Sequence, residues 1–378
     1  MAIRKLTASQ PELARVREGV ITGYLFKIIR ESIPRTQDEL AEDLGVDKST
    51  VQGWESGRRP LPATKAGNLI AIRRRLLRLG ASANLVQLMH TSMDADFILG
   101  VLLAEPTTGR LAGDHPLAGW VLNRDTTHML AWAMSGILPG SVAANTDTPS
   151  ARRGPVAVAP LLGQPEREQV FASLRHAAEL AERAGDDGAL LRRQARYLCG
   201  YDRTPDATTW LARAQRPRKA PAGWSPQWAE DRSLAASLAR RGDPEQLLDF
   251  IARSLGDDAS EAANLNYWAH WVGVDTRPQS DDSFMARQTP GWDAAALLRN
   301  FTDRLARAFE YTDLYAHSVW ALLSARPGLL SADRALACDL AASVGQLLDG
   351  DAISPQSRRE LQAVHYGLRL SGVSTDRP

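Results

Sequence analysis

The sequence predicts an all-α protein: a small helix-turn-helix unit near the N-terminus, followed by a large helical, solenoid-like region. Three observations support this fold class. Apolar residues recur at helical spacing along most of the chain, and the breaks between the helices are short, such as AGDDG and GDPE. No stretch shows the alternating pattern of a half-buried strand. The segment Thr36 to Pro60 carries the start and stop signals of two short, closely spaced helices.

The first of these two helices begins with a capping box. Thr36 is a good N-cap, and Glu39, three residues later, can return a hydrogen bond to the backbone N–H of the cap. Gly45 ends the helix, since glycine adopts the positive φ of a helix C-terminus at little cost. Asp47 is the expected cap of the second helix. A turn this short makes the two helices cross at a steep angle.

The second helix has an apolar side formed by Val51 and Trp54, so its polar residues should face outwards. Side chains on that outer side can meet base edges, whereas the N-terminus of the first helix and the basic residues after the second suit phosphates. We expect Lys48, Ser49, Gln52 and Gly53 to face outwards. The expected DNA-contacting residues are Gln37, Lys48, Ser49, Thr50, Gln52, Gly53, Arg58 and Arg59.

This segment resembles the helix-turn-helix of the lambda-repressor/Cro (XRE) family, in its long actinobacterial form. The residues that carry the resemblance are Thr36-Gln37, Gly45-Val46, Ser49-Thr50-Val51, Trp54-Glu55, Gly57, Arg59 and Pro60. The resemblance covers about 60 residues with flanking helices, and it implies a compact five-helix DNA-binding domain. Lys48, Ser49, Gln52 and position 53 would read the major groove, while Gln37 and Arg58 would hold the DNA backbone.

Position 53 departs from the family pattern, because the family usually has a polar residue there and this chain has Gly53. A glycine inside a helix costs about 1 kcal/mol relative to alanine. Two explanations are open. Either one base contact is missing, or the helix lies unusually close to the DNA.

The charge distribution fits DNA binding by the N-terminal part alone. Residues 1–80 contain 15 Lys and Arg against 9 Asp and Glu, whereas residues 81–378 contain 30 against 35. A basic head on a mildly acidic body suits phosphate binding by the head. Two cysteines give no disulfide framework, and no apolar run resembles a signal peptide or a membrane span, so we expect a cytoplasmic protein. The 40 Arg against 5 Lys indicate a GC-rich coding bias.

The chain divides into four parts by composition and periodicity. We predict a DNA-binding domain over residues 12–80, a helical connecting or dimerisation segment over 81–138, a proline-rich linker over 139–165 and a helical C-terminal domain over 166–378. Helices are expected at 11–32, 63–79, 84–104 and 117–138. The helix over 63–79 carries four arginines, which suit a phosphate clamp, a contact with a second protomer, or simply a solvated face.

One aromatic patch in the C-terminal domain is a candidate ligand site. Tyr267, Trp268 and Trp271 lie within NLNYWAHW, next to asparagine and histidine residues, and such groups can line a pocket. The alternative is a helical core with polar edges. The succession of helix pairs resembles tetratricopeptide arrays, although no clean 34-residue repeat is present.

The sequence contains no phosphate-binding loop, dinucleotide-binding motif, zinc-protease motif or recognisable nucleophile motif, and its seven histidines are scattered. We therefore expect no enzyme activity, no cofactor and no metal site. The favoured function is a sequence-specific transcriptional regulator that binds double-stranded DNA as a homodimer on an inverted repeat, with a body that responds to a small molecule or peptide. The alternative is an interaction protein, such as an antitoxin or scaffold, in which DNA binding is secondary.

Overall fold

The predicted fold class is confirmed. The computed structural model describes residues 19–104, 112–146, 159–213, 223–288, 291–305, 307 and 309–371, and within these ranges the regular structure is helical throughout, with no strand. No helix in the described ranges is long and apolar enough to cross a membrane. The chain forms two compact units. Unit 1 comprises residues 1–110 and 124–176, and unit 2 comprises residues 111–123 and 177–378.

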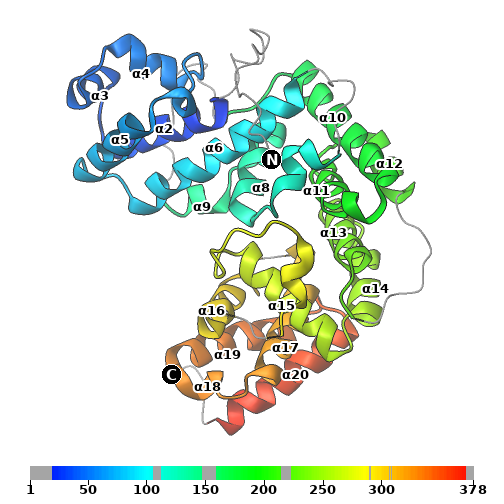
Figure 1. Ribbon diagram of the computed structural model, residues 1–378. Helices are drawn as coiled ribbons and strands as arrows, with labels where there is room; N and C mark the ends of the chain where they lie inside the picture. Colours follow the sequence, from blue (N-terminus) through cyan, green and yellow to red (C-terminus); the bar gives the residue numbers. More distant parts are fainter. Residues whose placement is uncertain are drawn as a thin grey trace. The chain divides into compact units, whose positions relative to one another are not determined.

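Unit 1 contains the predicted helix-turn-helix and the helices that pack around it (Figure 1). Its elements are α2 (Val20–Ser32), α3 (Gln37–Leu44), α4 (Lys48–Glu55), η1 (Leu61–Ala63), α5 (Ala66–Arg78), α6 (Ala83–Leu103), α8 (Arg124–Ser135), α9 (Gly140–Ala143) and the first part of α10 (Gln164–Arg183).

Helix α2 is central to unit 1 because it packs against both α4 and α6. Its N-cap residue is Gly19, which has no side chain to satisfy the first backbone N–H groups. Asp96 of α6 takes this role, since its two carboxylate oxygens accept from the N–H groups of Ile21 and Thr22 at 2.9 and 2.8 Å. The start of the predicted helix, residues 11–18, lies outside the described residues.

The ends of the predicted linker are packed within unit 1. Val142 of α9 is buried, and the N–H of Leu162 donates to the carbonyl of Ala133 at 3.0 Å. Residues 147–158, the middle of this segment, lie outside the described residues. The described parts of 139–165 therefore contribute to the packing of unit 1.

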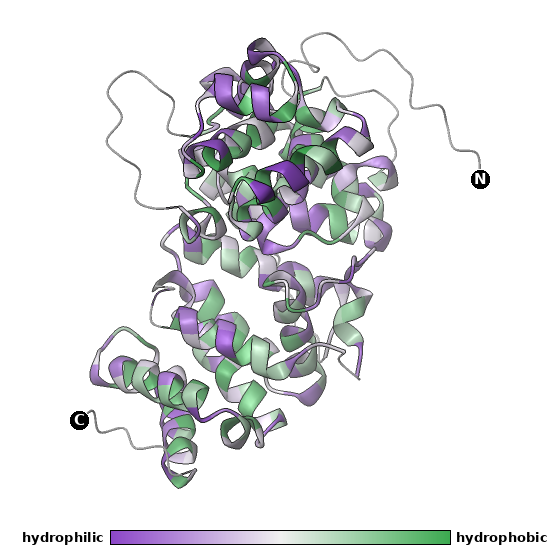
Figure 2. Ribbon diagram, turned by 90° about the vertical axis from the view of Figure 1, so that its left-hand side faces the viewer, coloured by the Kyte–Doolittle hydropathy of each residue, from purple (hydrophilic) through white to green (hydrophobic). Residues whose placement is uncertain are grey.

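Unit 2 is a helical assembly whose helices carry both hydrophobic and hydrophilic residues along their length (Figure 2). Such amphipathic helices bury one side against their neighbours. Its elements are η2 (Ala112–Asp114), α7 (Pro116–Gly119), the end of α10, η3 (Gly185–Gly188), α11 (Ala189–Cys199), α12 (Pro205–Arg213), α13 (Pro226–Arg240), α14 (Glu245–Ser254), α15 (Asp258–Trp271), η4 (Asp282–Ala286), α16 (Ala294–Leu305), η5 (Phe309–Tyr311), α17 (Thr312–Ala325), α18 (Leu329–Ala332), α19 (Arg334–Asp349) and α20 (Pro355–Leu370).

The helices of unit 2 pack on helices that are close to them in chain order. Helix α11 packs on α13 and α13 on α14, while α16 packs on α17 and α19, and α17 packs on α20. In a solenoid each repeat contacts only its neighbours, and these contacts are compatible with that rule. The tetratricopeptide-like arrangement remains a prediction.

The prediction of one continuous helix over 117–138 is wrong, because α7 and α8 are separated by residues 120–123. Long-range bonds hold this break. The N–H of Val121 donates to the carbonyl of Gln279 at 2.8 Å, and the N–H of Leu122 donates to Gln194 Oε1 at 2.7 Å. The break also divides the two units, since residues 111–123 belong to unit 2 and α8 to unit 1.

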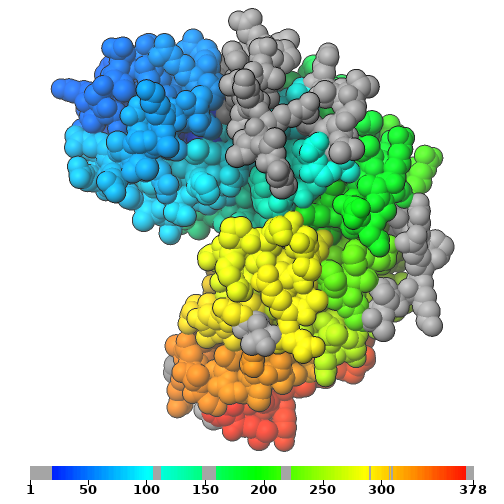
Figure 3. All heavy atoms as spheres, in the orientation of Figure 1, coloured from blue at the N-terminus to red at the C-terminus, as the bar shows by residue number. Residues whose placement is uncertain are grey.

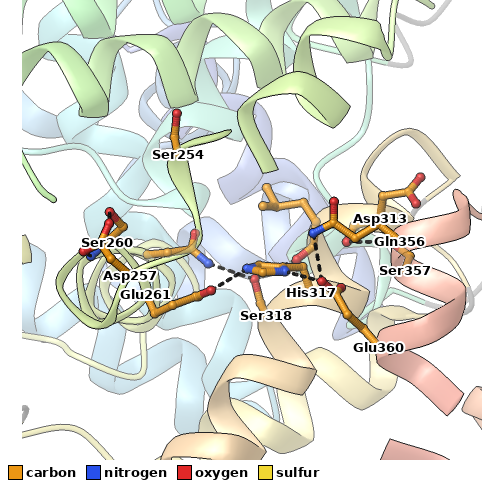
Figure 4. A network of polar contacts seen from close by, with 12 residues as sticks. Ser254, Asp257, Ser260, Glu261, Asp313, His317, Ser318, Gln356, Ser357 and Glu360 are labelled. Atoms are coloured by element: carbon orange, nitrogen blue, oxygen red, sulfur yellow. Dashed lines mark hydrogen bonds and ion pairs between the residues drawn. The ribbon is translucent and has the colours of Figure 1, made fainter. Parts of the chain in front are cut away.

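A polar network joins three helices of unit 2 around His317 of α17 (Figure 4). Its Nε2 lies 2.8 Å from Glu261 Oε1 of α15, and its Nδ1 lies 2.9 Å from Glu360 Oε1 of α20. Burial opposes protonation of this imidazole, but the hydrogen bonds to the two carboxylates outweigh it and raise the pKa of His317 to about 9. His317 is therefore charged at neutral pH and links the three helices electrostatically.

Candidate nucleic-acid interface

The local signals that define α3 are confirmed. The Thr36 hydroxyl accepts from the N–H of Glu39 at 3.2 Å, and Glu39 Oε2 accepts from the N–H of Thr36 at 2.8 Å. The Thr36 hydroxyl also donates to Glu39 Oε2 at 2.8 Å, and the bonds from the backbone and hydroxyl of Thr36 to this carboxylate hold the pKa of Glu39 below its ordinary value. Gly45 ends the helix in the left-handed conformation, with φ of 66°. Helix α3 is thus fixed at both ends.

Asp47 is the N-cap residue of α4, as predicted, but its side chain makes no capping hydrogen bond. The inner side of α4 is formed by Val51 and Trp54, both buried. The Trp54 ring meets Phe26 of α2 edge to face, with centroids 5.8 Å apart. At Gly23 of α2, an added Cβ would lie 2.2 Å from the Trp54 carbonyl oxygen, so only glycine permits this helix crossing.

A chain of polar contacts links α2, α3 and α4. Glu55 pairs with Arg30 of α2 and accepts from Gln37 Nε2 at 2.6 Å. The Gln37 amide oxygen in turn accepts from Gln52 Nε2 at 3.1 Å. The structure thus brings together Gln37 and Gln52, which the sequence suggested for DNA backbone and base contact respectively. Sequence reasoning missed the supporting pair of Arg30 and Glu55, because 25 residues separate them.

The remaining outward residues of α4 are accessible at the surface of unit 1, where α3 and α4 form part of the dark-blue region of the space-filling view (Figure 3). Lys48 is exposed, and its Nζ lies 2.6 Å from Asp38 Oδ2, which is exposed too. Ser49 is exposed and Thr50 is half-buried. An exposed ion pair of this kind contributes little to stability, so Lys48 can exchange Asp38 for DNA at small cost.

The expectation that Gly53 faces outwards is wrong, because the side chain of Arg59 covers it. A Cβ added at Gly53 would lie 3.1 Å from both Cγ and Cδ of Arg59. The Arg59 guanidinium continues along the helix, where Nη1 donates to the Thr50 hydroxyl at 2.9 Å. Arg58 takes a different course, since its Nε donates to Ser56. Because Gly53 has no side chain, the side chain of Arg59 from the following loop can lie directly on α4.

The arginines of α5 fall into two groups. Arg75 donates to Asp43 Oδ1 at 2.8 Å, and Arg35 contacts the other oxygen of the same carboxylate at 3.2 Å. Arg74 and Arg78 are exposed. Part of the arginine-rich side therefore holds α3 against α5, and the rest faces solvent.

The three aromatic residues suggested as a ligand site lie in the interior of unit 2. Tyr267, Trp268 and Trp271 are 4, 4 and 9 % exposed. Tyr267 stacks on Trp271 with centroids 6.0 Å apart, and Trp268 Nε1 donates to the Ser318 hydroxyl at 2.9 Å. All three form part of the core, and Tyr267 and Trp268 also contact buried arginines, Arg193 and Arg232.

Comparison with known proteins identifies the N-terminal part of the chain. The helix-turn-helix family matches residues 26–70, which include the second half of α2, α3, the turn, α4, η1 and the start of α5. No characterised protein and no solved structure matches the chain. The matched residues coincide with the capping box, the left-handed glycine and the buried Trp54 described above. Unit 1 therefore contains a helix-turn-helix domain of the lambda-repressor/Cro (XRE) type, a domain of DNA-binding transcriptional regulators.

Proposed function

We propose that the protein is a sequence-specific transcriptional regulator that reads double-stranded DNA through α4. The observation that carries the proposal is the contact between Gln37 and Gln52 at the junction of α3 and α4, held from behind by Glu55. An amide fixed in this way loses less conformational freedom on binding, and a glutamine can bond both N6 and N7 of adenine.

The proposed roles of the other residues follow from their positions. Lys48 would break its ion pair with Asp38 and contact a base. Ser49, the next residue of α4, is exposed. Gln37 would position the DNA backbone through the N-terminus of α3, where free N–H groups favour phosphate. Arg58 is exposed and suited to a second phosphate.

We propose that the protein binds as a homodimer on an inverted repeat, with half-sites about one helical turn apart. Exposed apolar side chains in unit 1 support self-association. Ile70 and Leu77 of α5 are 50 and 44 % exposed, seven residues apart on the same side of the helix, and Phe97 of α6 is 57 % exposed. A twofold contact would cover these residues in a second copy of the chain.

The role of Arg58 is tested by the salt dependence of DNA binding. Removing one phosphate contact should weaken binding to all sequences alike and reduce the slope of log K against log salt by about one unit. We expect this result for Arg58→Ala in fluorescence anisotropy on a fragment from the upstream region of its own gene and on random DNA. Arg253→Ala, an exposed arginine in unit 2, is the control. An unchanged slope for Arg58→Ala would remove this residue from the interface.

A further inference from the structure

Three arginines lie close together inside unit 2. Arg193 of α11 and Arg232 of α13 are 3 and 4 % exposed, and Arg240 lies two turns after Arg232 on α13. The Tyr197 ring lies 4.5 Å from the Arg240 guanidinium. A cluster of buried arginines is unusual, because a buried charge is unfavourable unless it is paired.

Arg193 is fully paired. Its Nε and Nη2 donate to the two oxygens of Asp282 at 2.8 and 2.6 Å, which is the bidentate geometry that guanidinium groups favour. Asp282 thus neutralises the charge of Arg193, and this ion pair needs no further partner.

Arg232 lacks such a partner. Its Nε donates to Asn264 Oδ1 at 3.0 Å, and the guanidinium lies over the rings of Tyr267 and Trp268 at 4.2 and 5.0 Å. Its buried Nη2 has no acceptor among the described residues. Burial lowers the pKa of Arg232 to about 10, and the neighbouring Arg193 acts in the same direction. The two rings stabilise the cation from its faces, but they leave the N–H groups at its edge unsatisfied.

Arg240 shows the same pattern. Its Nε donates to the Tyr311 hydroxyl at 3.1 Å, and its guanidinium lies over Tyr201 at 4.0 Å. Its Nη1 is buried and has no acceptor within the described part of the chain. Counting only described residues, two guanidinium groups on one side of α13 each keep a donor without an acceptor, and neither contacts a carboxylate.

We propose that this cluster binds a small anionic effector, through a carboxylate or phosphate group that accepts from Arg232. The anion would supply the acceptor that Nη2 lacks and the negative charge that the cluster lacks, and the Arg240 charge would add to the attraction. Tyr267, Trp268 and Asn264 hold the guanidinium in place for this contact. The inference rests on the proposed function in one respect, because it names the chemical class of the signal that unit 2 of the regulator would bind.

The proposal is tested by thermal unfolding of the full-length protein without DNA, in phosphate, in citrate and in chloride at equal ionic strength. A ligand that binds the folded state raises its Tm. We expect 20 mM phosphate or citrate to raise the Tm of the wild type by several degrees more than that of Arg232→Met. Arg253→Met, which removes an exposed arginine of α14, is the matched control and should respond like the wild type.

Several results decide the question. A larger gain in phosphate than in citrate would indicate a phosphate-bearing effector, and the reverse a carboxylate. Equal gains for all three proteins would overturn the proposal, because they would reflect only the general effect of the salts. If Arg232→Met does not fold, Asn264→Ala replaces it, and an undiminished gain in that variant overturns the proposal. Because the assay contains no DNA, it can fail while DNA binding by unit 1 stands.

Discussion

At the scale of single residues, the structure offers a third explanation of why position 53 is a glycine and not the polar residue usual in the family. The residue makes room for Arg59, whose stem lies on α4 and whose guanidinium reaches Thr50. The sequence showed that a polar side chain was missing at position 53 but could not show what replaced it, because the replacement comes from a loop six residues later. Arg59 thereby lies exposed on α4, and we propose that it bonds guanine O6 and N7 there.

Gly53→Ala should separate stability from recognition. The new methyl group would displace Arg59, while alanine favours the helix by about 1 kcal/mol over glycine. We expect unchanged or slightly higher stability in urea unfolding, together with a changed preference at one base pair in a selection from random DNA. Gly67→Ala in α5, where an added Cβ meets no atom within 4 Å, is the control for the helix effect alone. Identical base preferences for Gly53→Ala and the wild type would refute this role of Arg59.

His317 should make the stability of the protein depend on pH. Its pKa of about 9 in the folded chain is above the ordinary value of 6.5, so the folded state holds the proton more tightly. The stabilisation is complete below about pH 6.5 and is lost as pH rises towards 9, with a magnitude on the order of 1–3 kcal/mol. In urea unfolding, the wild type should lose more stability than His317→Gln between pH 6.5 and 9.5.

The control for this experiment is His90→Gln, which removes an exposed histidine and should retain the pH dependence of the wild type. If wild type and His317→Gln lost stability in parallel, the charged link between α15, α17 and α20 would contribute nothing measurable.

At the scale of elements, helix ends were predicted correctly where the residues that determine them lie close together in the sequence. The start and end of α3 follow from Thr36, Glu39 and Gly45, all within ten residues, and these predictions are confirmed. The break between α7 and α8 depends on Gln194 and Gln279, more than 70 residues away, so the apolar pattern over 117–138 concealed it. Local chemistry is readable from sequence, whereas long-range hydrogen bonds require the fold.

The capping of α2 by Asp96 also depends on hydrogen bonds between residues far apart in the sequence. We expect Asp96→Ala to lower the free energy of unfolding of unit 1 by about 1–3 kcal/mol, because two buried N–H groups lose their acceptor. Urea unfolding of the full-length protein followed by circular dichroism would measure the effect. Asp94→Ala, a half-buried carboxylate on the same helix that lies 3.9 Å from His90, should have a smaller effect. Equal effects of the two substitutions would contradict the capping role.

At the scale of the whole molecule, the sequence predicted an all-helical chain with a basic DNA-binding head, and both the fold class and the helix-turn-helix are confirmed. The buried arginines of unit 2 were not predictable, because Arg232 and Arg240 follow the same spacing as charged residues on a solvated helix side. The sequence suggested Tyr267 and Trp268 as ligand-binding residues only because of their aromatic side chains. Their contact with Arg232 became visible only when α13 and α15 were brought together.

The most direct test of the central claim is a selection from random double-stranded DNA with the full-length wild type and with Gln52→Ala. If α4 reads bases through Gln52, the wild type should enrich an inverted repeat, and Gln52→Ala should lose about 1–3 kcal/mol of discrimination at one position of each half-site. The other positions should keep their preference. A wild type that enriches no sequence, or a Gln52→Ala protein that keeps full preference at every position, would contradict the assignment of α4 as the reading helix.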